Sequence, residues 1–443
     1  MNLLKSLYIN NLFFYLIIGI VALSVFGFIF YILFFIAQLL FIGLIVLLVI
    51  DIFLLFKHKN ALVAQRNTMD KLSNGDENEI TILVENNYPF PVHLEIIDEL
   101  PYQFQVRNTS FELTLKSGAK KMITYPLRPT ARGEYEFGAI NCFASSKIGL
   151  ISRKMQFSEH AKVPVYPSFI QMRHFELLAF SNRLTQAGIK KIRKIGRNTE
   201  FEKINEYVAG DDFKTINWKA TARKDKLMVN QYQEEKSQNV YSIIDMGRAM
   251  KMPFKGLTLM DYAINASLVI SNIIIKKYDK AGLITFNNKL KSVLKAEHKS
   301  SHIQKIMDLL YSQKTGYAES NFEELYTTIK YKLNQRSLLL LYTNFETIDS
   351  LQRQMKYLRG IAKNHLLVVI FFENTELTTL ATKIANTTEE IYFQTIAEKF
   401  AYEKKIILKQ LQNNGIQAIY TSPEDLTINS INKYLEIKAR QLL

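Results

Sequence analysis

The feature that most constrains this sequence is an uncharged apolar run near its N-terminus. No charged residue occurs between Leu12 and Ile50. A helix needs about 20 residues to cross the hydrocarbon core of a bilayer, so a run of this length predicts two crossings joined by a tight turn. The most polar interior position is near Gln38, and we expect the turn around Ile32 to Gln38. A cleavable signal peptide would have a shorter apolar region followed by small residues, and this pattern is not seen.

Charges on both sides of the run predict its orientation. The basic residues are Lys5 before it and Lys57, His58, Lys59 and Arg66 after it. A hairpin places both flanks on one side, and positive flanks favour the cytoplasm. We therefore expect everything after Phe56 to be cytoplasmic. The single cysteine, Cys142, excludes an internal disulfide framework and agrees with a reducing compartment.

The net charge of +15 has two interpretations. Basic proteins bind nucleic acids, and they also lie against anionic inner leaflets, where each nearby Lys or Arg contributes on the order of 1 kcal/mol. A chain that already carries a membrane anchor favours the second interpretation. Membrane lipid is thus an expected partner, and nucleic acid is not.

The length of 443 residues predicts two or three domains. After a transmembrane hairpin with its flanks (1–66), residues 67–167 show short strands separated by turn signals, which is typical of a β-sandwich. Residues 168–238 form a basic, turn-rich linker. From 239 to 443, continuous apolar strands alternate with amphipathic helices, which predicts an α/β domain with a doubly wound parallel sheet.

Ligands of such sheets bind outside the carboxyl ends of the strands. No dinucleotide fingerprint, P-loop or G-x-S-x-G elbow follows any predicted strand. The first strand, "NVYSIIDMG", ends in Asp245, the place where a von Willebrand factor A domain carries the Asp-x-Ser-x-Ser motif of its metal-ion-dependent adhesion site.

This adhesion site is degenerate here. Gly247 and Ala249 replace the two serines, and Thr343 and Asn344 stand where a later strand would supply an Asp. These changes remove two hydroxyls and one negative charge from an oxygen-ligand set suited to Mg²⁺. We therefore expect no cofactor, with Asp245 acting as a structural cap and Mg²⁺ binding as the alternative. His298 and His302 have the i, i+4 spacing of a zinc site but lack its glutamate and a third ligand, so we expect them on the surface.

The linker contains the stretch "EYVAGDDFKTINWKATARKDK" (Glu206 to Lys226), which could be a catalytic loop, a nucleic-acid grip or a structural clasp. A metal-dependent nuclease needs a carboxylate two residues before the lysine, and Asn217 stands there. The preceding basic residues lack the aromatic interleaving of single-strand grips; they are Lys190, Lys191, Arg193, Lys194 and Arg197. We therefore expect a clasp, in which Trp218 is an apolar anchor against the sheet edge and Asp211 or Asp212 pairs with Lys214 or Arg223.

This stretch resembles the hallmark of a bacterial family known as domain of unknown function 58. The resemblance rests on "EFEKINEYVAGDDFKTINWKATAR" (Glu200 to Arg223), the strand ending in Asp245, and the upstream "YPLRPTARGEYEFGAINCFASSKIGL". Two N-terminal transmembrane helices and a von Willebrand factor A-like domain match the family as well. The signature positions are Tyr207, Gly210, Asp211, Asp212, Asn217, Trp218 and Arg223.

The resemblance implies a non-catalytic protein of the bacterial inner membrane. Members of the family have no established activity and are often encoded beside MoxR-type AAA+ ATPases, which implies an adaptor in complex assembly or envelope stress. A scaffold or sensor without an ATPase partner is the alternative, and a nucleic-acid enzyme is a weaker one.

Overall fold

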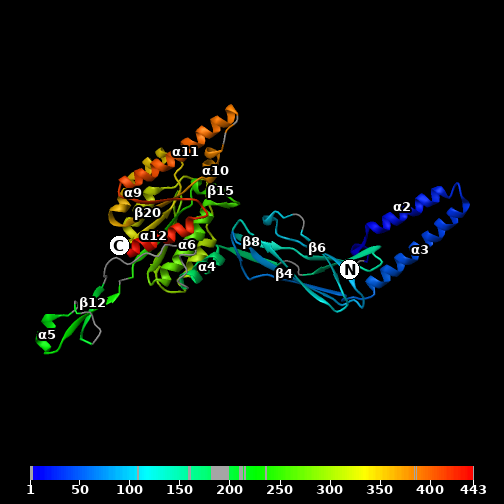
Figure 1. Ribbon diagram of the computed structural model, residues 1–443, viewed down its shortest axis with the longest axis horizontal. Coiled ribbons are helices and arrows are strands. Elements are labelled where there is room, and N and C mark those ends of the chain that lie inside the picture. Colours follow the sequence, from blue (N-terminus) through cyan, green and yellow to red (C-terminus); the bar gives the residue numbers. More distant parts are fainter. Residues whose placement is uncertain are drawn as a thin grey trace. The chain divides into compact units, whose positions relative to one another are not determined.

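The computed structural model describes residues 3–106, 109–157, 161–180, 199–208, 213, 216–234, 237–383, 385 and 387–442 (Figure 1). The chain divides into two compact units, Met1–Tyr166 and Pro167–Leu443. The structure confirms a mixed α/β protein that begins with apolar helices and contains several sheets.

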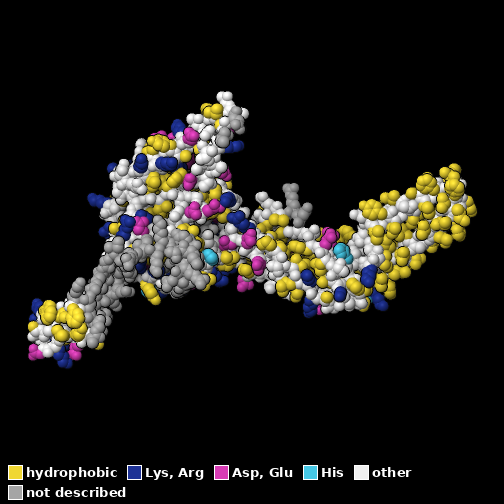
Figure 2. Space-filling view, viewed as in Figure 1, with side chains coloured by type: hydrophobic (Ala, Val, Ile, Leu, Met, Phe, Trp, Pro, Cys, Tyr) yellow, Lys and Arg dark blue, Asp and Glu magenta, His cyan; other side chains and the backbone are white. Residues whose placement is uncertain are grey.

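The apolar run forms α2 (Asn11–Phe26) and α3 (Tyr31–Phe56), which pack against each other and are called the hairpin below. The turn lies at residues 27–30, so the expected position of the turn, around Ile32 to Gln38, is wrong. Gly27 explains the difference, because a Cβ at this position would lie 2.7 Å from the backbone nitrogen of Phe34. By length and composition α3 could cross a membrane, whereas α2 is a shorter apolar helix. Hydrophobic side chains cover the hairpin surface (Figure 2).

Three antiparallel or mixed sheets complete the first unit. Their orders are β1-β10-β9-β5-β6, β3-β11-β8 and β2-β4-β7. Buried and exposed residues alternate along β4, as in a sheet with one face on a core. The strands are β1 (Leu7–Ile9), β2 (Leu62–Asn67), β3 (Leu72–Ser73), β4 (Asn78–Asn86), β5 (Val92–Asp98), β6 (Ser110–Leu115), β7 (Lys120–Leu127), β8 (Gly133–Phe137), β9 (Ile140–Ser145), β10 (Ile151–Phe157) and β11 (Ala161–Tyr166).

Both ends of the hairpin are hydrogen-bonded to these sheets. Before it, α1 (Leu3–Ser6) leads into β1, which pairs with β10, and the Asn10 side chain donates to the Gly149 carbonyl at 3.0 Å. At the other end, the Arg153 guanidinium donates to the carbonyls of Leu55 and His58 at 2.6 and 2.7 Å. The sandwich thus holds the first and the last turn of the hairpin.

Arg66 is a core residue of the sandwich rather than a membrane-flanking charge. Its guanidinium forms a two-point ion pair with Asp98, and both side chains are almost completely buried. Tyr125 donates a hydrogen bond to the same carboxylate, and the Phe137 ring lies 5.0 Å from the guanidinium carbon. Arg66 was expected to flank the membrane anchor; in the fold its side chain is paired and buried within the sheets. Because β2 contains this residue, the sandwich begins before residue 67.

The second unit is built on a six-stranded sheet of order β18-β17-β14-β19-β20-β21. Five strands are parallel, and β18 pairs antiparallel with β17 at one edge because the short loop 287–289 joins them. The strands are β14 (Asn239–Asp245), β17 (Lys280–Phe286), β18 (Leu290–Glu297), β19 (Leu338–Tyr342), β20 (Leu366–Phe372) and β21 (Gln417–Thr421).

Helices pack on this sheet in two groups. In one, α6 packs against β14 and β17 together with α4 and α12; in the other, α8, α9 and α11 pack against one another and the neighbouring strands (Figure 1). α6 is apolar enough to pass for a membrane span, but it is 89% buried and is a core helix. The helices are α4 (Phe169–Phe180), α6 (Leu259–Lys276), α7 (His302–Tyr311), α8 (Phe322–Lys332), α9 (Ile348–Asn364), α10 (Thr375–Thr382), α11 (Thr388–Asn413) and α12 (Leu426–Ala439).

The antiparallel strand β18 also shows that the expected i, i+4 placement of His298 and His302 on one helix is wrong. Residues 290–297 form β18, so His298 follows a strand while His302 begins α7. The two residues therefore share no helix face. His302 is buried, not on the surface, and desolvation lowers the pKa of its imidazole.

Candidate functional site

The carboxylate of Asp245 lies buried at the carboxyl end of β14. It accepts hydrogen bonds from the Thr343 hydroxyl at 2.6 Å, from the Gly247 N–H at 2.8 Å and from the Ser320 hydroxyl. Burial raises the pKa of this carboxyl, and the three hydrogen bonds oppose that rise. The structure thus brings Asp245 and Thr343 together, as the degenerate adhesion site predicted.

Ser320 is the residue that sequence reasoning missed. A Cβ built on Gly247 would lie 2.0 Å from the Ser320 hydroxyl oxygen, so this hydroxyl fills the space beside Asp245 that a side chain at 247 would need. Ser320 lies 75 residues after Asp245 and just before α8, away from any strand end. No spacing in the sequence signals this contact.

Asn344 is bonded to a different partner. Its side-chain oxygen accepts a hydrogen bond at 2.8 Å from the ammonium of Lys404 in α11, which also donates to the Phe345 carbonyl. Burial lowers the pKa of Lys404 to about 8, and nearby Glu346 opposes the shift. The Lys404 ammonium therefore already binds the Asn344 oxygen that the sequence pattern placed in the metal site.

These contacts leave a poor fit for Mg²⁺. Asp245 and Asn344 line a cleft of about 200 Å³, but the Asp245 oxygens already accept hydrogen bonds from three donors. Mg²⁺ prefers sites with one or two carboxylates and open octahedral positions. Among the described residues, no group of three or more His, Cys, Asp or Glu could hold a metal.

The signature segment forms a small lobe of β12 (Thr199–Glu206), α5 (Trp218–Lys224) and β13 (Met228–Glu234), called the signature lobe below. The two strands pair with each other, and neither belongs to the six-stranded sheet. The segment was predicted to fold against the edge of that sheet; its two strands share no hydrogen-bonded pairing with the sheet. Four residues of the clasp prediction lie outside the described residues: Gly210, Asp211, Asp212 and Lys214. The basic residues of 190–197, considered for nucleic-acid binding, lie outside them as well.

Asn217 has a structural role in the signature lobe. Its side-chain oxygen accepts a hydrogen bond from the Ala220 N–H at 3.0 Å and caps α5, while its amide donates to Asn230 at 2.8 Å. An aspartate could accept the first bond but could not donate the second. The position that argued against a nuclease is thus explained by local structure.

Two aromatic residues of the signature segment, Phe213 and Trp218, face solvent. Trp218 is 69% exposed and Phe213 is 71% exposed, and the Phe213 ring lies 5.5 Å from that of Tyr207. Arg223 is exposed in the last turn of α5. Figure 2 shows hydrophobic side chains gathered on this lobe beside basic and acidic ones. Trp218 is therefore not the buried anchor that the clasp prediction required.

Comparisons with solved structures give only weak likenesses. Proximal thread matrix protein 1 from the mussel byssus matches with 11% identity and a TM-score of 0.26 over 45% of this chain and 46% of that one. The CARDB domain of PF1109 from Pyrococcus furiosus matches with 14% identity and a TM-score of 0.17, over 24% of this chain and 94% of that one. Scores this low say nothing about function.

Comparisons with known sequences bear on the signature lobe and the sheet. The uncharacterized protein YeaD of Bacillus subtilis (strain 168) is 24% identical over 192 residues, which are 40% of this chain and 46% of that protein. This chain thus spans less than half the length of the curated relative that it matches. Residues 203–382 match the family described as "Protein of unknown function DUF58". This match and the similarity to YeaD confirm the resemblance to the DUF58 family that was drawn from the signature segment.

Proposed function

We propose that this chain is a non-catalytic, membrane-anchored protein-interaction module that works as an adaptor for a MoxR-type AAA+ ATPase. Its hairpin would cross the bacterial inner membrane twice and leave the rest of the chain in the cytoplasm, with a sheet domain of von Willebrand factor A type. The process served would be complex assembly or envelope stress. The observation that carries the proposal is the exposed apolar surface of the signature lobe.

That surface has the composition of a protein-binding site. Val208, Phe213 and Trp218 are each about two thirds exposed or more, at 67, 71 and 69%. Contiguous exposed apolar side chains mark interaction sites, and Trp is among the residues most enriched at their energetic centres. The exposed ion pair of Lys226 with Glu206 at 3.1 Å joins two residues of this lobe and contributes little to its stability.

The Asp245 site supports a binding role over a catalytic one. Its carboxylate is held by three internal donors rather than left facing a substrate. A general base must reach the proton that it abstracts, and this group is 2% exposed. The arrangement favours a structural carboxylate that fixes the loops around it.

The hairpin contacts support the two-pass anchor. Asn10 and Arg153 link the start and the end of the hairpin to the same sandwich. Both ends must then lie on the sandwich's side of a bilayer. An α-helical hairpin satisfies its own backbone hydrogen bonds, as the hydrocarbon core requires.

The test is affinity purification of the tagged full-length protein from membranes, with and without ATP, followed by mass spectrometry. We expect an AAA+ ATPase to co-purify, and Trp218→Ala and Phe213→Ala to reduce its recovery. Tyr331→Ala is the matched control, because Tyr331 is 74% exposed in α8, outside the signature lobe.

Absence of an ATPase under both nucleotide conditions would reject the adaptor role and leave the alternative, a scaffold or sensor without an ATPase partner. Recovery that Trp218→Ala and Tyr331→Ala reduce equally would reject the signature lobe as the docking surface.

A further inference from the structure

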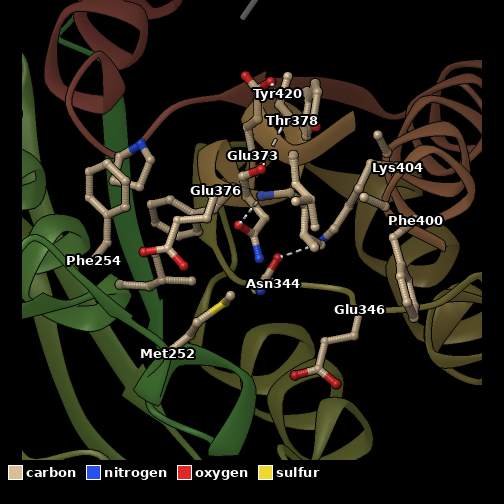
Figure 3. Close-up of a pocket in the computed structure, with 18 of the residues that line it drawn as sticks. Met252, Phe254, Asn344, Glu346, Glu373, Glu376, Thr378, Phe400, Lys404 and Tyr420 are labelled. Atoms are coloured by element: carbon tan, nitrogen blue, oxygen red, sulfur yellow. Dashed lines mark hydrogen bonds between the residues drawn. The ribbon is translucent and has the colours of Figure 1, made fainter. Parts of the chain in front are cut away.

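A second feature of the α/β unit is a cavity of about 300 Å³ on residues that the signature lobe does not share. It lies beyond the carboxyl ends of β19, β20 and β21. The short strand β15 (Pro253–Phe254) and the helices α10 and α11 border it (Figure 3). Ligands of open α/β sheets bind at this edge. The volume is at the lower end of the range for ligand sites.

The cavity walls are apolar and partly open to water. Phe254 and Phe400 stand on opposite sides of it in Figure 3. Phe400 and Leu380 are each 38% exposed and Phe393 is 48% exposed, although all three line the cavity. A ligand that covers these side chains would remove apolar surface from water, which favours binding.

Lys404 lies at the floor of this cavity and is fixed by the protein. Its ammonium donates to the Asn344 side chain (Figure 3) and also to the Phe345 carbonyl, so two of its three N–H groups are used internally. The side chain is 9% exposed. Lys404 thus holds the loop after β19 in place and is poorly placed to be the main ligand contact.

Carboxylates dominate the remaining charge. Glu346, Glu373 and Glu376 line the cavity, against the single ammonium of Lys404. Glu373 accepts a hydrogen bond from Thr378 at 3.0 Å. Within the described part of the chain, none of the three glutamates has an ion-pair partner within 4.0 Å. The charge of the cavity therefore complements a cation.

We propose that this cavity docks a basic amphipathic segment of a partner protein. Its apolar side chains would enter between Phe254 and Phe400, and a Lys or Arg beside them would meet the glutamates. Docking of an amphipathic segment into an apolar groove is a common mode of peptide recognition. The two surfaces are independent, so this site does not depend on ATPase binding at the signature lobe.

The test uses the full chain in phosphatidylcholine nanodiscs and fluorescein-labelled peptides read by fluorescence anisotropy. One probe carries Leu and Phe interleaved with Lys; a second replaces each Lys with Glu; a third replaces each Leu and Phe with Ser. Empty nanodiscs give the background. We expect only the first probe to bind.

Matched variants locate the binding. Glu376→Lys should weaken the Lys probe about tenfold or more, since like charges would then oppose each other. Glu398→Lys makes the same charge change on α11 outside the cavity and should have little effect. Phe400→Ala should weaken binding, while Tyr402→Ala, at a 65% exposed residue that does not line the cavity, should not.

Circular dichroism melting checks that each variant folds. The proposal is wrong if folded Glu376→Lys binds the probe as well as Glu398→Lys does. Preference for the Glu probe would overturn it as well, because it would indicate an anionic ligand held by Lys404.

Discussion

Asp51, near the end of α3, accepts a hydrogen bond at 3.0 Å from the backbone N–H of Leu150, at the start of the β10 segment. The same carboxylate accepts bonds from the Ile151 N–H at 3.2 Å and from the Ser146 hydroxyl, and its side chain is fully buried. One acid inside an apolar helix thus satisfies three donors of the sandwich. A charged acceptor at this place ties the hairpin to the sheets through specific bonds rather than through apolar packing alone.

Replacing Asp51 with Ala should destabilise the sandwich by about 3 kcal/mol, because buried donors would lose a charged acceptor. Cys142 reports this directly, since it is the only cysteine and is fully buried in the sandwich core. Its labelling by a maleimide should become about 100-fold faster if labelling follows opening of the fold. Asp70→Ala, at an exposed acid, is the control and should leave the rate unchanged. Equal labelling rates in Asp51→Ala and Asp70→Ala would show that the hydrogen bonds of Asp51 do not stabilise the sandwich.

The buried ion pair of Arg66 with Asp98 predicts a non-additive result. Arg66→Met leaves the Asp98 carboxylate buried without its cation and should cost about 3–5 kcal/mol, whereas Arg66→Met with Asp98→Leu should cost less because no charge remains. Cys142 labelling again measures both variants. Lys120→Met removes the exposed pair with Glu85 and should cost at most about 1 kcal/mol. Additive losses in the double variant would contradict this reading.

A feature of this fold is predictable from the sequence when the residues that determine it lie close together in the chain. The hairpin and the apolar strands follow from local composition: the apolar run Ser337 to Phe345 predicts a strand, and Leu338–Tyr342 of it is one. The turn at Gly27 was missed because its reason is a close approach to Phe34, which composition does not show. Asp245 ends β14 and Thr343 directly follows β19, and both were candidates because the carboxyl ends of parallel strands meet at one edge.

Charged residues with distant partners were the hardest to predict. Arg66 resembles a membrane-flanking charge in the sequence, and only its pairing with Asp98, 32 residues later, makes it a core residue. Lys404 sits in a helix rich in lysine and glutamate, so its burial depends on how α11 packs against the loop after β19. Trp218 was expected to be an apolar anchor against the sheet edge, and the structure leaves it 69% exposed.

The contact of Gly247 with Ser320 predicts a rescue. Gly247→Ala should destabilise the α/β unit by about 1–3 kcal/mol, since the new Cβ would meet the Ser320 hydroxyl at 2.0 Å. Adding Ser320→Gly removes the obstructing hydroxyl and should recover part of the loss. Thermal unfolding followed by circular dichroism gives both values. If Ser320→Gly deepens the loss instead, its bond to Asp245 outweighs the steric conflict.

Metal binding offers a separate test of the Asp245 site. We expect titration calorimetry of the full chain with Mg²⁺ or Mn²⁺ to show no micromolar binding, because three internal donors compete for the only carboxylate of the set. Restoring the adhesion motif with Gly247→Ser, Ala249→Ser and Asn344→Asp, together with Ser320→Gly to make room, should raise the affinity. Micromolar binding by the unmodified chain would show that the hydroxyls of Ser320 and Thr343 can reorient to coordinate a metal ion.

Lys404 should make the stability of the α/β unit depend on alkaline pH. Its pKa is about 8 in the fold and about 10.4 when exposed, so the unfolded state binds more protons between these values and stability rises with pH there. The gain is about 3 kcal/mol across this range, by the conversion of 1.36 kcal/mol per pKa unit. Lys404→Met removes this titration, so the unfolding free energy of the wild type should rise relative to that of the variant from pH 8 to pH 10.4. Denaturant unfolding at both pH values measures the difference. The other titrating groups are common to both proteins. If the unfolding free energy of the wild type relative to that of Lys404→Met stays constant or falls with pH, the pKa of Lys404 is not lowered in the fold.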